Sequence, residues 1–592
     1  MPIDDIRNKL QEILSQAIES ARKAGELDIQ PSAPQVDVPK DASFGDFSTN
    51  VAMALAKSAR RSPRDVAGII LKHFSPPDKL LASPPELVGA GFINFRISPD
   101  TWRRAIGRII GMGRKYGSSD VGGGEKVMVE FVSANPTGPL HVGHARGAAV
   151  GDSLARILKA SGWKVIKEFY LNDAGAQVDI LAKTVHARWL EKQGIQVDWD
   201  KVFPDGNYYP GDYVREIAKD MPIRMGDIET FKKIKAGDFD DSERYWAVSE
   251  IREGISKDLL AFRVEFDFWF FESELYKNKI ADTVLDKLKG QGDIYEKDGA
   301  KWFRVSNYQP DEEDRVIRKS SGEWTYFASD IAYHANKIER LQKWGQGTDI
   351  RLINIWGADH HGYIPRVKAS LQALGLPPDK LQVLLVQMVN LVRAGEPVRM
   401  GKRTGEFVTL REVMEEVGTD AMRFTFLTRS SDSQLNFDID TLKAKPGEDS
   451  ELKMSQLREK NPVYYVQYAH ARANAIFRKA ALRIEDIESY NDADCSKLTL
   501  AEEIDLARKL ESFPREVATA AAAAEPHRIS HYLIELAGDF HRYYYLGDRN
   551  PSYRVLSEEE TIRKARLAMV AAVATVIHNG LDLLGVEAPE RM

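Results

Sequence analysis

The chain carries two histidines three residues apart, His141 and His144, in a loop with two prolines and two glycines. The loop reads SANPTGPLHVGH and stands between an apolar run, VMVEFV, and a stretch with helical spacing. The first turn of a helix offers unpaired backbone N–H groups and the positive end of the helix dipole, which attract phosphate. Two histidines in a polar turn can also be ordinary surface groups. The order of strand, Pro/Gly turn and helix favours a site for a nucleoside triphosphate.

Two other positions carry side chains that could bind a cation. Glu130 lies within VMVEFV, where an unpaired charge would be costly to bury, so it needs a cationic partner. That partner is either a substrate cation or a protein arginine such as Arg146. In WGADHHGY, Asp359, His360 and His361 could suggest metal ligands. Adjacent histidines point apart on a helix or a strand, so a shared metal ion is not expected.

A strand-turn-helix unit must position these side chains. VMVEFV is typical of a buried strand, and apolar residues recur at helical spacing from about Gly143 to Ala160. A second extended run, VIKEFYL, follows after a short join. Strand, helix and strand with short joins predict a parallel, doubly wound sheet of the Rossmann kind. After a segment without this alternation, we expect the sheet to resume near Trp324 and to continue through IRLINIW and LQVLLVQMVNLV.

The rest of the chain divides around this unit into three predicted domains. Residues 1–112 alternate helical and extended patterns and predict a small α+β domain. The glycine-rich stretch Gly111–Lys126 is interpreted as a flexible joint. Residues 113–445 form the Rossmann-like domain, with an insertion at about 186–300. Residues 446–592 are helical in period and predict an all-α bundle.

Length and composition fit a multidomain globular protein. The chain has 592 residues, above the roughly 250 to 300 at which one core stops growing, and 43% are hydrophobic. Cys495 is the single cysteine, which excludes an internal disulfide and a multi-cysteine zinc site, so no structural zinc is expected. We expect a cytoplasmic protein with no membrane partner, because no signal peptide or membrane-spanning run is recognised. With a net charge of −6, nucleic-acid contacts would need individually placed side chains.

Two segments resemble the signatures of a known enzyme family. HVGH at 141–144 matches the HIGH-type signature of class I aminoacyl-tRNA synthetases, and the flanking SANPTGPLHVGHARG resembles arginyl-tRNA synthetases in particular. RMGKR at 399–403 resembles a degenerate KMSKS loop, with Lys402 at the second lysine. Arg399 replaces the first lysine and keeps its charge, whereas Gly401 replaces the serine and loosens the loop. NPVYYVQYAHAR and the C-terminal GLDLLGVEAPERM extend the resemblance into the helical part.

The resemblance implies a ligase that activates L-arginine with ATP, with Mg²⁺ on the nucleotide, and transfers it to tRNA(Arg). Phosphoryl transfer demands mainly positioning and charge neutralisation, so the phosphate contacts are the implied catalytic groups: His141, His144 and Lys402. The implied ATP-binding residues are Gly143, Arg399, Met400, Asp359 and His360. The implied arginine-binding residues are Glu130, Asn135, Tyr326 and Asp330.

An arginine substrate agrees with elementary chemistry. A guanidinium is planar, always charged and has five donors, so a selective pocket needs at least one fixed carboxylate. Tyr326 and Asp330 are four apart in TYFASDIAYH, hence on one helical face, and resemble the family's arginine-reading pair. Asn135 would bond the substrate's ammonium or carboxylate. The alternatives are that Asp330 caps a helix and that Tyr326 packs in the core.

The resemblance also implies tRNA contacts in the first and last domains. Tyr465 and Tyr468 in the helical part are candidates to stack on splayed anticodon bases, although most tyrosines at helical spacing pack in a core. Phe92 and Asn94 in GAGFINF match the family's nucleotide-contacting stretch, with core packing as the alternative for Phe92. We expect the chain to act as a monomer.

Two other functions remain open at this point. A class I synthetase for another amino acid would share the HVGH segment, but the lack of paired cysteines disfavours its zinc-holding types. An RNA-binding paralogue without catalysis would use the fold as a scaffold, but the presence of His141, His144 and Lys402 disfavours it.

Overall fold

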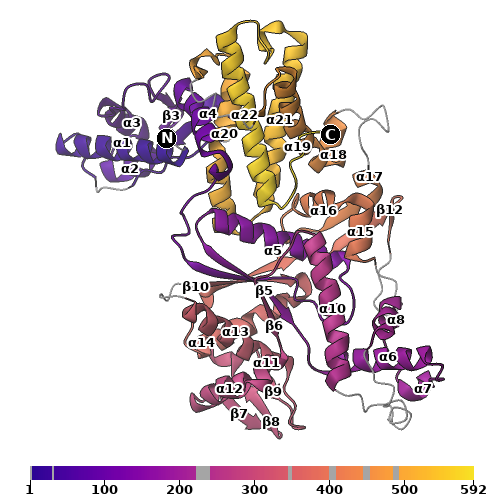
Figure 1. Ribbon diagram of the computed structural model, residues 1–592. Helices are drawn as coiled ribbons and strands as arrows, with labels where there is room; N and C mark the ends of the chain where they lie inside the picture. The colour runs from indigo at the N-terminus through magenta and orange to yellow at the C-terminus, as the bar shows by residue number, and fades with distance from the viewer. Residues whose placement is uncertain are drawn as a thin grey trace.

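The computed structural model describes residues 3–29, 33–39, 41–221, 241–344, 350–398, 408–443, 454–484 and 493–592. Figure 1 shows three parts: an N-terminal unit beside a tall helical bundle, and a layered α/β part below the bundle. One cluster of buried apolar side chains runs through all three. The predicted fold class is confirmed: a parallel-sheet part lies between an N-terminal α+β part and a C-terminal all-α part.

The N-terminal unit packs helices on a small antiparallel sheet with the strand order β1-β3-β2. Its last helix, α4, leaves this sheet and packs against two bundle helices, α20 (Ala501–Ala523) and α22 (Glu560–Leu583). The first part of the chain is thereby fixed to the last part. Bounds are α1 (Ile3–Lys23), β1 (Phe47–Thr49), α2 (Val51–Ala59), α3 (Pro63–Lys72), β2 (Glu86–Val88), β3 (Phe92–Phe95) and α4 (Pro99–Met112).

The segment between α4 and the central sheet is packed, so its interpretation as a flexible joint is wrong. Tyr116 is 4% exposed, and its hydroxyl donates to the Leu510 carbonyl at 3.1 Å. Asn579 of α22 donates to the Tyr116 carbonyl at 2.9 Å. A Cβ added at Gly117 would lie 2.4 Å from the Phe513 ring. The glycine at this position admits an aromatic ring instead of loosening the chain.

Five parallel strands form the central sheet in the order β11-β10-β4-β5-β6. Every residue of β4 is buried, as expected for a parallel strand with helices on both faces. The order reverses on the two sides of β4, so the topological switch point, where α/β proteins bind ligands, lies between β4 and β10. Bounds are β4 (Lys126–Glu130), β5 (Lys164–Leu171), β6 (Phe268–Phe271), β10 (Ile350–Gly357) and β11 (Leu381–Val386).

Helices cover the two faces of this sheet. In Figure 1, α5 (Val142–Ala160) lies between the sheet and the bundle, which confirms the predicted helix, and α13 (Tyr326–Lys343) and α14 (Ile364–Ala373) lie below the sheet. Two ion pairs to buried glutamates tie α13 to neighbouring strands: Lys337 with Glu130 on β4, and Arg340 with Glu168 on β5. Because the two glutamates are register partners, the pairs fix both the position and the rotation of α13.

The edge strand β6 lies inside the range 186–300 that was expected to be an insertion. The parallel sheet therefore resumes at Phe268, and the expectation that it resumes near Trp324 is wrong. A four-residue strand that follows a long helix has too short a pattern to be recognised. Bounds are α6 (Ala176–Lys192), α7 (Trp199–Val202), α8 (Asp212–Lys219), α10 (Asp241–Ala261), α11 (Ser273–Lys277), α12 (Ile280–Gly290) and the antiparallel strands β7 (Ile294–Lys297), β8 (Ala300–Phe303) and β9 (Arg315–Arg318).

A small three-stranded sheet, β13-β12-β14, and several helices connect the central sheet to the bundle. The predicted strand LQVLLVQMVNLV is two strands, β11 and β12, in different sheets. Bounds are β12 (Val389–Arg393), β13 (Glu396–Pro397), α15 (Leu410–Val417), α16 (Thr419–Phe426), β14 (Leu435–Asp438), α17 (Ile439–Lys443), α18 (Met454–Lys460), α19 (Pro462–Lys479) and α21 (His527–Arg549).

The last helix, α22, is the one described helix long and apolar enough to cross a membrane by length and hydropathy. The sequence analysis expected no stretch of this kind. The high hydropathy comes from the many alanines and valines of α22. Of the apolar stretch of α22, 78% is buried inside the protein, as expected for the core helix of a bundle.

Candidate active site

An open cleft of about 690 Å³ lies at the switch point of the sheet. Three segments that follow strand ends line it: Val132–Gly147 after β4, Ile355–His360 at the end of β10, and Val386–Met388 after β11. Tyr209 and Tyr213, from the segment around α8, form another wall, and the Tyr213 hydroxyl donates to the Thr137 carbonyl at 2.5 Å. The cleft therefore occupies the place where the topology predicts a ligand.

The two histidines cap the first turn of α5 and face the cleft. His141 is the N-cap residue, and its Nδ1 accepts the Gly143 N–H at 3.1 Å. Nδ1 of His144 accepts the backbone N–H of His141 at 3.3 Å, and the two rings stack with centroids 3.8 Å apart. Because each Nδ1 acts as an acceptor, each neutral ring carries its proton on Nε2. The turn thus holds two Nε2–H donors at the positive end of a helix.

Gly143 is required by this arrangement. A Cβ at residue 143 would lie 2.9 Å from Nδ1 and Cε1 of His141. The glycine between the two histidines lets the His141 ring fold back over the turn and reach the backbone N–H.

The backbone between β4 and this turn is strained. Val132 and Ser133 both have positive φ angles, 68° and 40°, which are uncommon for residues with a side chain and rare for a β-branched one. The conformation brings the Ser133 hydroxyl to Glu130, to which it donates at 2.9 Å, and lets the same oxygen accept the Tyr170 N–H at 3.2 Å. The strained turn links the end of β4 to the end of β5.

Glu130 is part of a buried hydrogen-bonded network. Lys337 of α13 donates to Glu130 and, at 3.0 Å, to Asn354 of β10. Asn354 in turn bonds His334 at 2.8 Å, and burial lowers the pKa of His334 to about 3. The expectation that Glu130 needs a cation is met by Lys337. The alternative partner Arg146 is wrong, because Arg146 donates to carbonyl groups near the ends of β11 and α16.

Two further carboxyl groups lie beside this network, and no lysine or arginine among the described residues pairs with them. Asp330 accepts the Tyr363 hydroxyl at 2.5 Å, and burial raises its pKa to about 7. Glu272, at the end of β6, is 5% exposed and accepts from the Ser329 and Tyr276 hydroxyls at 3.0 and 3.2 Å. Burial also raises its pKa. The charge of Glu272 acts on Asp330, so the two carboxyl groups form an acidic cluster suited to a cation.

Most predicted cleft residues come together. Asn135, His141, Gly143, His144, Asp359 and His360 all line the cleft. Asn135 is exposed and donates to Gln177 at 3.0 Å, whereas Asp359 and His360 lie exposed on a 3-10 helix after β10. Glu130, Tyr326 and Asp330 do not line the cleft itself. Asp330 lies inside α13 and caps no helix end, and Tyr326 is 66% exposed, so both alternatives for this pair are wrong.

The predicted loop residues Arg399, Met400 and Lys402 lie outside the described residues. The chain re-enters the described structure at Val408, whose carbonyl accepts the Val142 N–H at 3.3 Å. Leu410 also donates to the Leu140 carbonyl at 2.8 Å. The end of this segment is therefore anchored beside the two histidines.

The predicted tRNA residues have different surroundings. Phe92 is 42% exposed, so core packing is wrong for it, but Asn94 is buried and accepts from Ser48 at 2.7 Å. Tyr465 is 6% exposed and packs on His541, so its proposed stacking on RNA is corrected to a role in the core. Tyr468 is half-exposed and faces Arg472.

Sequence reasoning missed three residues of this site: Glu272, Lys337 and Tyr363. Lys337 follows Asp330 by seven residues, so helical spacing could have placed it on the same face. Glu272 directly follows the short strand β6, which lies in the range expected to be an insertion. Nothing in the sequence pattern brings Tyr363 to α13.

Three family models match consecutive parts of the chain. They are "Arginyl tRNA synthetase N terminal domain" over residues 8–97, "tRNA synthetases class I (R), catalytic domain" over 106–433, and "DALR anticodon binding domain" over 466–592.

Curated relatives match almost end to end. The "Arginine--tRNA ligase" of Desulfosudis oleivorans is 45% identical over 94% of this chain and 95% of its own length. That of Anoxybacillus flavithermus is 44% identical over the whole of both chains. Among solved structures, a Campylobacter jejuni protein described as an arginyl tRNA synthetase is 33% identical, with a TM-score of 0.70 over 84% of this chain and 100% of that one. The Thermus thermophilus arginyl-tRNA synthetase has the same fold at 24% identity, with a TM-score of 0.73 over 99% of this chain and 100% of that one. This chain, with its capped histidine pair at the switch point and its two neighbouring carboxyl groups, belongs to the arginine–tRNA ligase family of class I synthetases.

Proposed function

We propose that this site joins L-arginine to tRNA(Arg) at the expense of ATP, with the guanidinium seated between Asp330 and Glu272. The observation that carries the assignment is a pair of desolvated carboxyl groups that form no ion pair with a lysine or arginine among the described residues. A guanidinium supplies the missing charge and meets carboxylates in two-point contacts. Lysine would bring the charge as a single point and leave acceptors unfilled.

Glu130 completes the pocket from the side of β4. One Glu130 oxygen accepts from the Ser133 hydroxyl, and the other is neutralised by Lys337. Glu130 therefore positions the neighbouring groups, while Asp330 and Glu272 carry the net negative charge. Tyr326 stands one helical turn before Asp330 and is exposed, so its ring is open to contact with the substrate. Asn135 lies across the cleft, where its amide meets the ammonium or carboxylate of the amino acid.

ATP occupies the cleft at the first turn of α5. The Nε2–H groups of His141 and His144 donate to phosphate oxygens, and Lys402 adds a positive charge to the developing pyrophosphate. Gly143 keeps the turn open, and Asp359, His360, Arg399 and Met400 contact the nucleotide. Mg²⁺ enters with the nucleotide as part of the substrate.

The reaction has two steps. An oxygen of the arginine carboxylate forms a bond to the α-phosphorus while the bond from that phosphorus to the bridging oxygen breaks, which releases pyrophosphate. A hydroxyl of the terminal ribose of tRNA then attacks the carbonyl carbon, and AMP leaves with the bonding electrons. His141, His144 and Lys402 act by stabilising phosphate charge, so no covalent enzyme intermediate is needed.

The tRNA contacts an aromatic, basic surface on the bundle. Arg472 lies between Tyr468, Tyr544 and Tyr545, with its guanidinium carbon 4.6 to 4.8 Å from each ring centroid. Such a stack offers ring faces to splayed bases and a charge to phosphate. Phe92 of the N-terminal unit is an exposed ring that stacks on another base. Asn94 supports that strand from the interior, through Ser48.

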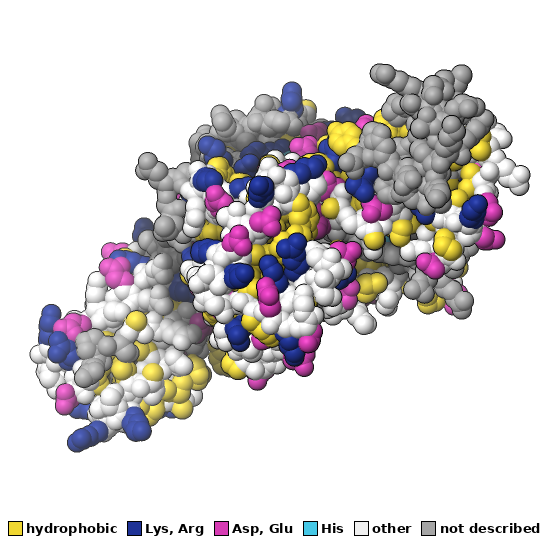
Figure 2. All heavy atoms as spheres, turned by 90° about the horizontal axis from the view of Figure 1, so that it is seen from below, with side chains coloured by type: hydrophobic (Ala, Val, Ile, Leu, Met, Phe, Trp, Pro, Cys, Tyr) yellow, Lys and Arg dark blue, Asp and Glu magenta, His cyan; other side chains and the backbone are white. Residues whose placement is uncertain are grey.

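A second surface that contacts RNA is the outer face of the sheet β7–β9. Three aromatic rings there each form a cation–π contact: Tyr295 with Arg304, Trp302 with Lys297, and Trp324 with Arg318. Figure 2 views the protein from the side on which this sheet lies in Figure 1, and shows Lys and Arg beside a band of hydrophobic side chains. Acidic side chains are interspersed, so placed contacts rather than general charge hold the RNA.

The domains 1–112, 113–445 and 446–592 then divide the work among tRNA contact, catalysis and anticodon recognition. The protein acts as a cytoplasmic monomer, without a membrane partner and without structural zinc.

Charging of purified tRNA(Arg) with a panel of twenty amino acids tests this function. Only arginine should give charged tRNA, and Lys402→Ala should lower the rate by roughly 100-fold while tRNA binding persists. Charging with a different amino acid would overturn the substrate assignment. RNA binding with no charging at all would favour a binding paralogue.

A further inference from the structure

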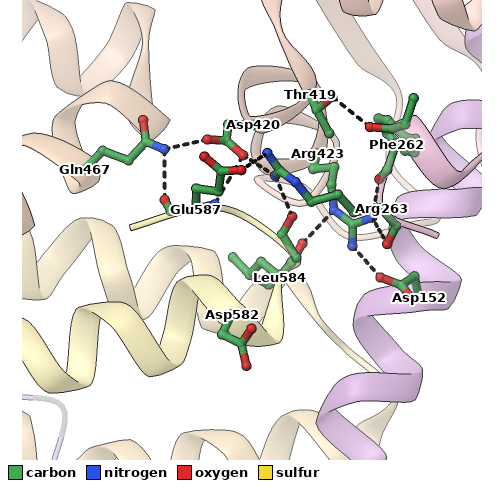
Figure 3. Close-up of polar contacts among 12 residues, drawn as sticks. Asp152, Phe262, Arg263, Thr419, Asp420, Arg423, Gln467, Asp582, Leu584 and Glu587 are labelled. Atoms are coloured by element: carbon green, nitrogen blue, oxygen red, sulfur yellow. Dashed lines mark hydrogen bonds and ion pairs between the residues drawn. The ribbon is translucent and has the colours of Figure 1, made fainter. Parts of the chain in front are cut away.

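The helix that carries the histidine pair is tied to the end of the chain by a buried charge cluster (Figure 3). Asp152, in the middle of α5, is completely buried. Burial alone would raise its pKa, but three cations outweigh this effect and lower it. Arg423 donates to Asp152 at 2.7 Å, Arg156 at 2.8 Å and Lys167 at 3.0 Å. Of the three, Arg423 alone is fully buried.

Arg423, on α16, uses its other donors on backbone carbonyls from two distant segments. Its Nε donates to Leu584 at 2.9 Å, just beyond the end of α22, and its Nη1 donates to Phe262 at 2.8 Å. Gly585 has a φ of 65°, and a Cβ there would lie 2.3 Å from Nη2 of Arg423. The glycine lets the chain end pass directly over the guanidinium.

A second set of contacts holds the same chain end in place. Asp420 of α16 receives bonds from Arg263 and from the Glu587 N–H, the latter at 3.2 Å. Gln467 of α19 donates to Asp420 at 2.8 Å and to the Glu587 carbonyl at 2.9 Å. The segment from 584 to 587 is therefore clamped among α5, α16 and α19, as Figure 3 shows.

We propose that Arg423 is a positioning residue that acts through Asp152. Arg423 binds both Asp152 on α5 and the chain end at Leu584, so the position of the chain end fixes the position of α5. The position of α5 in turn places His141 and His144 at the nucleotide. This inference rests on the proposed function. Asp152 lies eight residues beyond His144, about 12 Å along a rigid helix at ~1.5 Å per residue. A displacement at Asp152 is carried along the helix to the two Nε2–H donors. A misplacement of about 1 Å at reacting groups costs on the order of 100-fold in rate.

Gly585→Ala tests the proposal without removing any polar side chain. The added Cβ must push the Arg423 guanidinium out of its place. Gly375→Ala is the matched control, because Gly375 also has a positive φ, 79°, but a Cβ there meets nothing within 4 Å. Both variants carry the cost of left-handed backbone for alanine, and only the first displaces Arg423.

The readouts are kcat and KM for tRNA charging, together with the fraction of active sites that form adenylate in a single turnover. We expect Gly585→Ala to lower kcat at least tenfold, with the active fraction and the KM values for arginine and tRNA within twofold of wild type. Gly375→Ala should keep kcat within twofold. A Gly585→Ala kcat equal to that of the control would overturn the proposal, as would a loss explained entirely by a smaller active fraction.

Asp152→Asn supplies a second test if Gly585→Ala fails to fold. The amide of asparagine keeps an oxygen that accepts from Arg423 but removes the negative charge that pairs with Arg423, Arg156 and Lys167. We expect a tenfold or greater loss of kcat with unchanged KM for tRNA, and unchanged kcat would contradict the proposal. Wild-type charging with arginine in the same assay separates this result from a failure of the proposed function.

Discussion

At the residue scale, the chemistry of this site depends on which desolvated carboxyl groups lack an ion-pair partner within the protein. Glu130 and Glu168 are buried but paired with cations of α13. Glu272 is buried and Asp330 is partly buried, and among the described residues both accept hydrogen bonds from hydroxyl groups and form no ion pair. Desolvation raises the pKa of each. Desolvated carboxyl groups without an ion-pair partner are expected where a cationic substrate provides the counter-charge.

Asp330 should make both activity and stability depend on pH. Its folded pKa of about 7 lies above the usual aspartate value of roughly 3.9, so the folded protein keeps the proton longer than the unfolded chain. The free energy of unfolding therefore falls as pH rises between these two values. The ionised form binds the guanidinium, so kcat/KM for arginine should rise as pH increases through about 7.

Asp330→Asn should separate these effects. At pH 8 it should raise the free energy of unfolding by roughly 1 to 3 kcal/mol, because a buried charge disappears, and raise the KM for arginine roughly 100-fold. Urea unfolding and charging assays at pH 6 and pH 8 measure both. A variant less stable than wild type at pH 8, or an unchanged KM, would contradict the role of Asp330.

Gly143→Ala should keep the fold and lose activity. The position has ordinary helical backbone, where alanine is favoured by up to about 1 kcal/mol, but the methyl group would displace the His141 ring. We expect a 10- to 100-fold lower kcat with an unchanged melting temperature. Gly107→Ala in α4, with nothing within 4 Å of the new Cβ, is the control. Full activity of Gly143→Ala would show that the ring position does not matter.

At the element scale, α13 carries Asp330, and two ion pairs set the position of this helix against the sheet. Lys337→Met leaves Glu130 buried without its cation and should lower the free energy of unfolding by about 3 to 5 kcal/mol. The double variant with Glu130→Gln should recover a large part of that loss. Denaturant unfolding of the single and double variants measures the difference. No recovery in the double variant would mean that Lys337 acts by packing alone.

The sequence predicted the elements better than it predicted the contacts between them. The strands β4, β5 and β10, helix α5, the turn with His141 and His144 and the helical bundle follow from local patterns, which periodicity and helix-start rules capture. The pairing of Glu130 with Lys337 joins residues 207 positions apart, beyond the reach of such rules. The prediction of a flexible joint at 111–126 was wrong for a related reason. The sequence does not distinguish a glycine that makes room for a distant ring, as Gly117 does for Phe513, from a glycine in a flexible linker.

At the scale of the whole molecule, the three parts share one core and are joined by a packed connection. The segment from 113 to 124 is held by Asn579 and by the Phe513 ring over Gly117. Bundle, linker and central sheet are therefore expected to move together and not as independent domains.

Limited trypsin digestion tests this. Arg114 and Lys115 are exposed, but their backbone is anchored, so the native protein should resist cleavage there. Asn579→Ala removes the bonds to Gly113 and Tyr116 and should speed cleavage at this site several-fold. Asn550→Ala, which removes only a local cap in the bundle, is the control. Rapid cleavage of the wild type at Arg114 or Lys115 would restore the flexible-joint interpretation.

The central claim is that two desolvated carboxyl groups, Asp330 and Glu272, select arginine by its positive charge. Charging of tRNA(Arg) with L-arginine and with L-citrulline, its uncharged isostere, tests it most directly. The account predicts a kcat/KM at least 1,000-fold higher for arginine, on the order of the penalty for leaving buried charged groups unpaired. Charging with citrulline within tenfold of arginine would contradict it.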